Sequence, residues 1–335
     1  MMTPRERVLA SLAHRAPDRT PYEIGFTFRA AEAMASYYGD VRFTDRIGNC
    51  LTGSGCEPPD AWREVAPAIW QDEFGVQWNR SVDRDIGVVC NQVVSADNVE
   101  AFALPDPARA QRFAGLESAL RNRGDRFVVA NLGFSLYERA WTLAGMENLL
   151  MAMATEPSYA HRLFDRILEY NLAIIERACA YDIDAMMFGD DWGQQSGLVM
   201  GARLWREFVG PRVRAMYQAA KRRGKFVFIH SCGKVDELFP DLIESGVDVF
   251  NPFQPEVIDV YDAKRRHGDR LTFFGGISTQ RLLPYGTPDQ VRDQVRRLLR
   301  EVGAGGGLIA APAHAIPGDA RPENVAAMIE VLQEG

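Results

Sequence analysis

Polar side chains that could bind a metal ion or transfer a proton follow several short apolar segments of this 335-residue chain. In chain order they are Asp190, Asp191 and Trp192 after 185–189, His230 and Cys232 after 226–229, Asn251 and Gln254 after 247–250, and His314 after 308–312. Tyr22 and Glu23 lie in a further apolar segment near the N-terminus. A core that serves stability alone does not need such groups, so the segment ends are candidates for a functional site.

His230 and Cys232 form the most specific pair among these candidates. Residues i and i+2 of an extended segment point to the same side, and imidazole nitrogen and thiolate sulfur are preferred zinc ligands. A catalytic zinc ion needs a third protein ligand, for which His314 is the first candidate. Asp190 or Asp191 could supply that ligand instead, or could orient a histidine ligand. In the simpler alternative, the pair belongs to the core and the two aspartates only cap the next helix.

The apolar segments alternate with amphipathic helices, most regularly after residue 125. Near-continuous apolar segments are typical of parallel strands buried on both faces, and their alternation with helices predicts βαβ units. Residues 88–94 are a candidate eighth strand beside seven clearer ones, which are 22–26, 127–132, 185–189, 225–231, 247–251, 271–275 and 307–312. We therefore predict an α/β fold, a (β/α)8 TIM barrel, with an open doubly wound sheet as the alternative. A barrel would gather the candidate residues at the C-terminal ends of its strands.

Residues of about 40–110 do not follow this alternation. This region contains Gly53-Ser54-Gly55, Pro58-Pro59 and several tryptophans between short polar breaks. We predict that residues 1–335 form a single barrel domain, in which about 40–110 are an insertion in the N-terminal half or a lid.

Composition argues against several classes of partner. The 38 Lys and Arg against 45 Asp and Glu give a net charge of −7, whereas binding to nucleic acid or an anionic membrane depends on clustered cations. Residues 1–20 are charged rather than signal-like, and five cysteines fit a reduced protein. We therefore predict a cytoplasmic protein with no nucleic-acid and no membrane partner. A homodimer is compatible with a barrel.

Several motifs resemble the uroporphyrinogen decarboxylase superfamily as a set that runs through nearly the whole chain. The N-terminal part of the set is Thr3-Pro4-Arg5-Glu6-Arg7-Val8-Leu9 followed by Pro17-Asp18-Arg19-Thr20-Pro21; the later parts are Phe188-Gly189-Asp190-Asp191-Trp192-Gly193, His230-Ser231-Cys232-Gly233, Ala311-Pro312-Ala313-His314-Ala315-Ile316 and Pro322-Glu323-Asn324-Val325. The resemblance also implies a (β/α)8 barrel.

The superfamily divides by chemistry. Its decarboxylases carry an arginine-rich stretch after the first strand, whereas Ile24–Ala30 here contains a single arginine, Arg29. Its other branch consists of cobalamin-dependent methyltransferases, of which the coenzyme M methyltransferases hold zinc through a His-x-Cys pair and a later Cys. His230 and Cys232 match the pair, but His314 stands where the later Cys is expected, which leaves the thiol substrate open.

The resemblance implies a zinc-dependent methyltransferase that works with a separate corrinoid protein carrying cobalamin. Its substrate would be a small-molecule methyl donor or a thiol. Asp190 or Asp191 would orient a ligand or transfer a proton, and Tyr22, Trp192, Asn251 and Gln254 would contact substrate. A metal-free decarboxylase or other lyase acting on a small carboxylic acid is the alternative, and a non-enzymatic binding protein on an inherited barrel is a third hypothesis.

Overall fold

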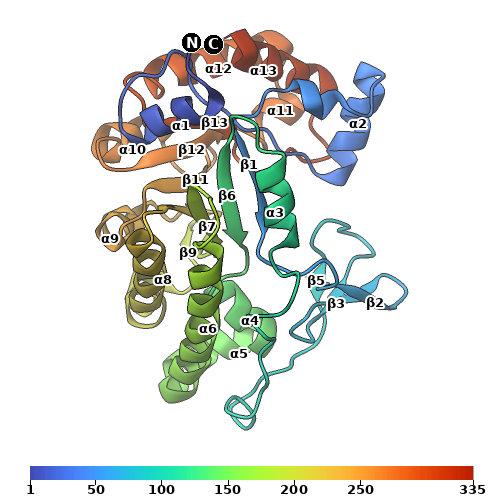
Figure 1. Cartoon of the computed structure of the whole chain (residues 1–335), viewed down its shortest axis with the longest axis vertical. Coiled ribbons are helices and arrows are strands. Elements are labelled where there is room, and N and C mark those ends of the chain that lie inside the picture. The colour runs from blue at the N-terminus through green and yellow to red at the C-terminus, as the bar shows by residue number, and fades with distance from the viewer. Residues whose placement is uncertain (335) are drawn as a thin grey trace.

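The computed structural model describes residues 1–334 and has a curled parallel sheet at its centre, as Figure 1 shows. Seven parallel strands pair in chain order: β1 (Leu51–Gly55), β6 (Phe127–Leu132), β7 (Ala185–Gly189), β10 (Phe226–His230), β11 (Val249–Phe253), β12 (Thr272–Ile277) and β13 (Leu308–Pro312). Most of their residues are buried, as expected for strands enclosed on both faces. The sheet confirms the predicted α/β barrel class.

The N-terminal segment 22–26 closes the ring between β13 and β1. Tyr22 bridges Ala310 in the parallel sense, and Phe26 bridges Ile316. On the other side, the backbone N–H of Cys50 donates to the carbonyl of Tyr22 at 2.9 Å. The segment therefore occupies the eighth strand position, although it makes isolated bridges rather than a regular strand.

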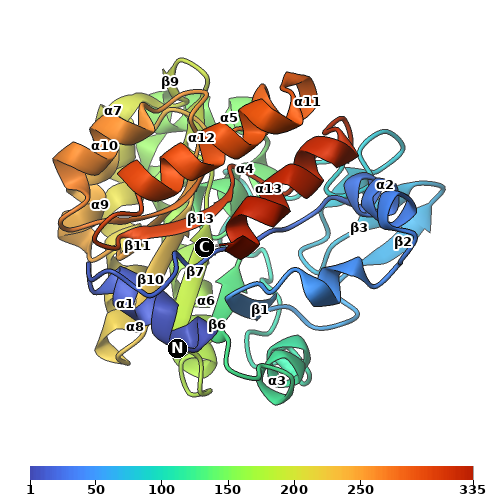
Figure 2. The ribbon, with the colours of Figure 1, turned by 90° about the horizontal axis from the view of Figure 1, so that it is seen from above.

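Helices cover the outside of the sheet, and Figure 2 shows α12 and α13 side by side over β13. The helices are α1 (Pro4–Leu12), α2 (Phe28–Tyr38), α3 (Ala114–Arg121), α4 (Tyr137–Ala144), α5 (Met146–Thr155), α6 (Pro157–Ala178), α7 (Gly201–Leu204), α8 (Gly210–Arg222), α9 (Phe239–Ser245), α10 (Val260–His267), α11 (Leu282–Tyr285), α12 (Pro288–Glu301) and α13 (Pro322–Glu334). Two short 3₁₀ helices, Phe43–Arg46 and Asp236–Leu238, and the π-helix Trp205–Val209 complete the set. Capping boxes at Thr3 with Glu6 and Thr287 with Gln290 start α1 and α12.

A separate antiparallel sheet lies to one side of the barrel in Figure 1. It consists of β2 (Arg63–Ala66), β3 (Ile69–Gln71), β4 (Gln77–Asn79) and β5 (Val88–Val89), and a small hairpin of β8 (Gly193–Gln194) and β9 (Gly197–Leu198) follows β7. The prediction of 88–94 as an eighth barrel strand was wrong, since only Val88 and Val89 are extended and they pair with β4. Local alternation did not distinguish this short antiparallel strand from a barrel strand.

The barrel strand β1 lies inside the range 40–110 that the sequence suggested as an insertion. Its sequence Leu-Thr-Gly-Ser-Gly has the composition of a turn, which concealed it. Packing against β6 requires a glycine at position 53, because a Cβ on Gly53 would lie 2.0 Å from the carbonyl oxygen of Val129. Close approach of two barrel strands, rather than turn formation, therefore explains Gly53.

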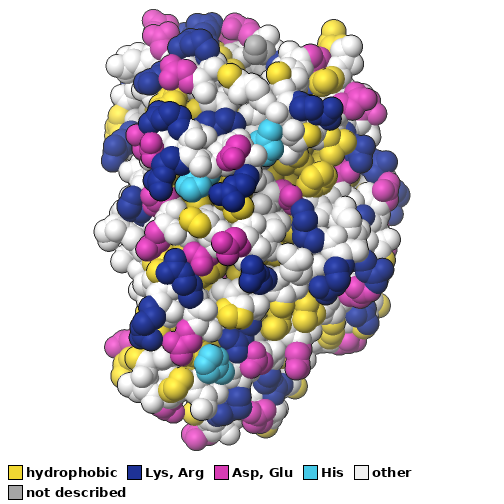
Figure 3. Space-filling model, turned by 90° about the vertical axis from the view of Figure 1, so that its left-hand side faces the viewer, with side chains coloured by type: hydrophobic (Ala, Val, Ile, Leu, Met, Phe, Trp, Pro, Cys, Tyr) yellow, Lys and Arg dark blue, Asp and Glu magenta, His cyan; other side chains and the backbone are white. Residues whose placement is uncertain are grey.

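Basic and acidic side chains are interspersed on the face drawn in Figure 3. Several arginines of the α7–α8 region are paired, for example Arg206 with Asp241 at 2.9 Å and Arg203 with Glu207 at 3.3 Å. These exposed pairs contribute little stability individually, because water and salt screen them. Within residues 1–334, no helix is both long enough and apolar enough to cross a bilayer.

Candidate metal centre and barrel pocket

Three predicted ligands converge at the C-terminal end of the barrel. One donor atom from each of His230, Cys232 and His314 lies within 4.8 Å of the other two. The separation between His230 Nε2 and Cys232 Sγ is 3.5 Å. Tetrahedral bonds of about 2.1 Å to nitrogen and 2.3 Å to sulfur place two zinc ligands roughly 3.6 Å apart, so this pair suits one shared ion.

Asn251 sets the tautomer of His230. Strand register places the two residues side by side on β11 and β10, and His230 Nδ1 lies 2.6 Å from Asn251 Oδ1. The amide is oriented by its other end, because Asn251 Nδ2 donates to the carbonyl of Phe274 at 3.0 Å. The hydrogen of His230 therefore sits on Nδ1, which leaves the Nε2 lone pair directed at Cys232 and free for a metal ion.

Replacing Asn251 by leucine should weaken zinc binding about 10–100-fold, because the histidine ligand loses the acceptor that orients it. Competition with a chromogenic chelator would measure this affinity. Asn131→Leu is the matched control, since Asn131 lines the same cavity without bonding to His230. Unchanged zinc affinity in Asn251→Leu would show that Asn251 does not position the ligand.

Backbone hydrogen bonds hold the turn that carries Cys232. The N–H of Ser231 donates to the carbonyl of Asn251 at 2.7 Å, and the N–H of Cys232 donates to Asp191 Oδ1 at 2.7 Å. The N–H of Gly233 donates to Gln254 Oε1, also at 2.7 Å. The turn that presents the thiol is thus held by three hydrogen bonds from its backbone to neighbouring segments.

Two glycines allow this turn to lie against the segment after β7. Gly233 has a φ of +87°, a conformation that other residues adopt at a cost. A Cβ on Gly193 would lie 2.6 Å from the carbonyl oxygen of Cys232. The sequence Asp-Asp-Trp-Gly and the sequence His-Ser-Cys-Gly therefore fit each other through their final glycines.

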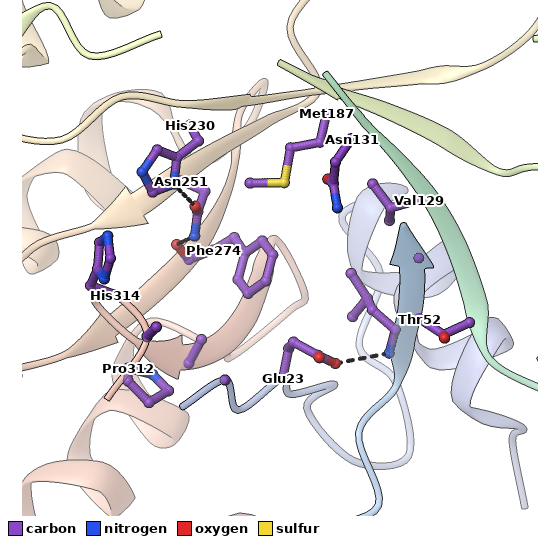
Figure 4. Close-up of a pocket in the computed structure, with 15 residues that line it drawn as sticks. Glu23, Thr52, Val129, Asn131, Met187, His230, Asn251, Phe274, Pro312 and His314 are labelled. Carbon is purple, nitrogen blue, oxygen red and sulfur yellow. Dashed lines mark hydrogen bonds between the residues drawn. The ribbon is translucent and has the colours of Figure 1, made fainter. Parts of the chain in front are cut away.

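The barrel mouth contains a cavity of about 430 Å³, and Figure 4 shows two of the three candidate ligands, His230 and His314, in its wall. Fifteen residues line it: Glu23, Gly25, Leu51, Thr52, Gly53, Val129, Asn131, Met187, His230, Asn251, Phe274, Ala311, Pro312, His314 and Ala315. None of them is lysine or arginine. The cavity therefore suits a small molecule and offers no cation to a substrate with many carboxylates.

Burial favours the neutral forms of the Cys232 thiol and the His314 imidazole. Burial, with Asp191 and Glu138 nearby, raises the pKa of the Cys232 thiol far above its usual range. Loss of hydration on burial lowers the pKa of His314, and the neighbouring His230 lowers it further. Part of His314 nevertheless remains exposed. A bound cation would favour the thiolate form of Cys232. Two imidazoles and one thiolate form a set of ligands that zinc binds in proteins.

Comparisons with known proteins identify the family of this chain. Residues 72–335 match the family model described as uroporphyrinogen decarboxylase (URO-D). The chain belongs to this family. The match covers most of the chain and confirms the resemblance seen in its motifs.

Relatives within the URO-D family carry out more than one reaction. A methylated-thiol–coenzyme M methyltransferase of Methanosarcina mazei is 26% identical over 197 residues, which are 58% of this chain and 52% of that protein. A uroporphyrinogen decarboxylase of Methylococcus capsulatus is 25% identical over 260 residues, or 73% of this chain and 70% of that protein. This chain therefore aligns with only about half of the methyltransferase and with 70% of the decarboxylase, so the alignments leave the reaction open.

A solved structure supports the barrel. A methyltransferase from Methanosarcina mazei superposes with a TM-score of 0.73 over 100% of this chain and 99% of its own, at 16% identity. At that identity the likeness concerns the fold. The reaction of this URO-D family member must be argued from its site.

Asp190 and Asp191 occupy different environments despite being adjacent. Asp190 is fully buried; its Oδ1 accepts from the N–H groups of Glu138 at 2.8 Å and Leu136 at 3.3 Å, and its Oδ2 accepts from Trp192 Nε1 at 2.7 Å. Burial raises the pKa of Asp190 to about 6. Asp191 is partly exposed and lies beside His230 and Cys232, with its Oδ1 3.8 Å from His230 Nε2 and 2.7 Å from the backbone nitrogen of Cys232. The structure therefore places Asp191 at the centre and Asp190 behind it, at the start of α4.

Three predicted substrate contacts lie away from the cavity. Tyr22 is buried and donates to the carbonyl of Ile47 at 2.7 Å, and Trp192 is buried against Trp205 and Asp190. Gln254 is occupied by the Gly233 turn. Of the four predicted substrate contacts only Asn251 lines the cavity, where it also holds His230.

Two further carboxyl groups lie in or beside the site: Glu23, which the sequence pointed to without giving it a role, and Glu138, which the sequence did not single out. Glu23 lines the cavity because it faces inward where Tyr22 faces outward, following the period of two in an extended segment. Glu138 lies behind Asp191, and burial together with Asp191 and Asp190 raises its pKa well above the usual range. The signal that could have indicated Glu138 is its position just after β6, at the strand end where barrel sites are built.

Proposed function

We propose that this chain is a zinc-dependent methyltransferase that moves a methyl group between a small molecule in the barrel pocket and a corrinoid protein carrying cobalamin. The observation that carries the proposal is the convergence of His230, Cys232 and His314 at the rim of the cavity. The sequence similarity to a methylated-thiol–coenzyme M methyltransferase supports methyl transfer, and the cation-free lining disfavours a polycarboxylate substrate.

In this proposal zinc, when bound, supplies a Lewis acid that favours a thiolate or polarises the atom bearing the methyl group. The chain's own residues prepare that chemistry. Asn251 keeps the Nε2 lone pair of His230 available, and Asp191 holds the backbone N–H of Cys232. The cavity would hold the small molecule beside His230 and His314, so that the reacting atoms are brought close together.

Methyl transfer can be followed by the absorbance change of the reduced corrinoid cofactor when it becomes methylated. We expect zinc-loaded protein to transfer methyl groups from methylated thiols or aryl methyl ethers, and we expect chelation to abolish transfer and added zinc to restore it. Release of carbon dioxide from small carboxylic acids that is insensitive to chelation would instead support the lyase alternative.

A further inference from the structure

Glu23 is the one acidic residue among the fifteen that line the barrel cavity, and none of the fifteen is lysine or arginine. Its side chain is partly exposed, whereas the residues on either side of it are buried, so the exposed part faces the cavity that it lines. Figure 4 shows the carboxyl group apart from His230 and His314, with Phe274 between them in this view. The cavity therefore holds a lone carboxyl group away from its two imidazoles.

Two N–H donors hold this carboxyl group. Asn49 Nδ2 donates to Glu23 Oε1 at 3.0 Å, and the N–H of Leu51 donates to Glu23 Oε2 at 3.2 Å. The orientation of the Asn49 amide is fixed, because its Oδ1 accepts from the N–H of Ile24 and its Nδ2 also donates to the carbonyl of Ile24, both at 3.0 Å. Both oxygens of Glu23 thus accept hydrogen bonds, as the oxygens of an ionised carboxylate do.

The residues that line the cavity supply Glu23 with no counter-ion. Arg126, whose charge also acts on Glu23, donates instead to the carbonyls of Asn122 and Arg123. A carboxylate that is removed from bulk water without a cation is unfavourable. Burial accordingly raises the pKa of Glu23 to about 8, and a cation bound beside the group would lower that pKa again. The missing positive charge therefore has to come from a molecule in the cavity.

We propose that the Glu23 carboxylate binds an ammonium group of the substrate, and that the cavity thereby selects small molecules that carry a positive charge at the end remote from the reacting methyl group or thiol. This inference rests on the proposed function, since it assigns the substrate class of the same site. A carboxylate has about four acceptor positions, so the bonds from Asn49 and Leu51 leave others for the ammonium group. A carboxylate or sulfonate end would be repelled by Glu23, and an uncharged end would leave Glu23 without a counter-ion.

Two thiols of the same shape that differ in charge test this selectivity. Thiocholine carries a trimethylammonium group where 3,3-dimethylbutane-1-thiol carries an uncharged tert-butyl group, and its nitrogen has no lone pair with which to bind zinc. Calorimetric titration of zinc-loaded protein at about pH 8 measures both affinities. We expect thiocholine to bind at least about tenfold more tightly, as close pairs of opposite charge do when they are shielded from water. The anionic thiol 2-mercaptoethanesulfonate should bind more weakly than either.

Glu23→Gln removes the charge and keeps the size of the side chain, so it should lose most of the preference for thiocholine. Any difference in acidity between the two thiols is the same in both proteins, and the change in preference therefore reports the charge of Glu23. Glu23→Asp keeps the charge and should retain part of the preference. Thr52→Val is the matched control, since Thr52 lines the same cavity without a charge, and it should retain the whole preference. Circular dichroism and zinc content check that each variant is folded and loaded.

Equal binding of thiocholine and its uncharged counterpart by wild type, or tightest binding of the sulfonate, would overturn the inference while leaving the proposed function standing. A preference for thiocholine that persists in Glu23→Gln would also overturn it, because the selectivity would then come from another group. Failure of zinc-loaded protein to bind any of the three thiols or any methyl ether would contradict the proposed function, and with it the inference.

Discussion

Replacing Cys232 by serine should reduce methyl transfer by about 10³-fold, because a Lewis-acid metal contributes several kcal/mol to such a reaction and its sulfur ligand would be lost. The fold should survive, since the backbone bond from Cys232 N–H to Asp191 does not involve the thiol. Methyl transfer to reduced cobalamin measures the activity, and circular dichroism checks that the protein is folded.

Cys90→Ser is the matched control for this substitution. Cys90 is exposed and lies just after β5 in the antiparallel sheet, away from the ligand cluster. It should retain wild-type activity and zinc content. Full activity in Cys232→Ser, at wild-type zinc content, would contradict the assignment of the thiol as a ligand.

Replacing Asp190 by alanine should lower the free energy of unfolding by about 3 kcal/mol at pH 7. The substitution leaves the indole N–H of Trp192 and the backbone N–H of Glu138 buried without an acceptor, at about 1–3 kcal/mol for each group. Denaturant unfolding of wild type and variant measures the difference.

Asp191→Ala is the matched control, because Asp191 is partly exposed. This substitution should change the free energy of unfolding by less than about 1 kcal/mol and should instead weaken zinc binding.

The Asp190 effect should also depend on pH. Because burial raises the folded-state pKa to about 6 from an ordinary 3.8, the folded state binds more protons than the unfolded state between these values. The stability that Asp190 contributes relative to Asp190→Ala should therefore fall as pH rises from about 4 to 6 and remain level above. A difference that stays level or rises with pH over this window would show that Asp190 is already ionised in the folded state.

Much of the site was predictable because barrel geometry converts positions along the sequence into positions in space. Strand ends that lie 84 residues apart, at His230 and His314, meet because parallel barrel strands present their C-terminal ends on one side. The i, i+2 spacing of His230 and Cys232 likewise predicted that their side chains point to the same side. No comparable rule predicted which of the two would bond to Asn251, since that depends on the register between β10 and β11.

The errors have a common physical origin. Near-continuous apolar strands carry no alternation that tells the inward from the outward face, so Tyr22 was assigned to the cavity in place of Glu23. Trp192 and Gln254 follow strands rather than belonging to them, and loop residues have no period from which a direction can be inferred. β1 was missed because Gly53 serves a close strand contact that only the folded structure makes visible.

In the proposed function, His230, Cys232 and His314 together hold one zinc ion. X-ray absorption at the zinc edge, on purified full-length protein supplied with zinc, tests it most directly because the spectrum reports the atoms bound to the metal. We expect one zinc ion per chain with one sulfur and two protein nitrogens among its ligands. Absence of bound zinc, or a zinc environment without sulfur, would contradict it.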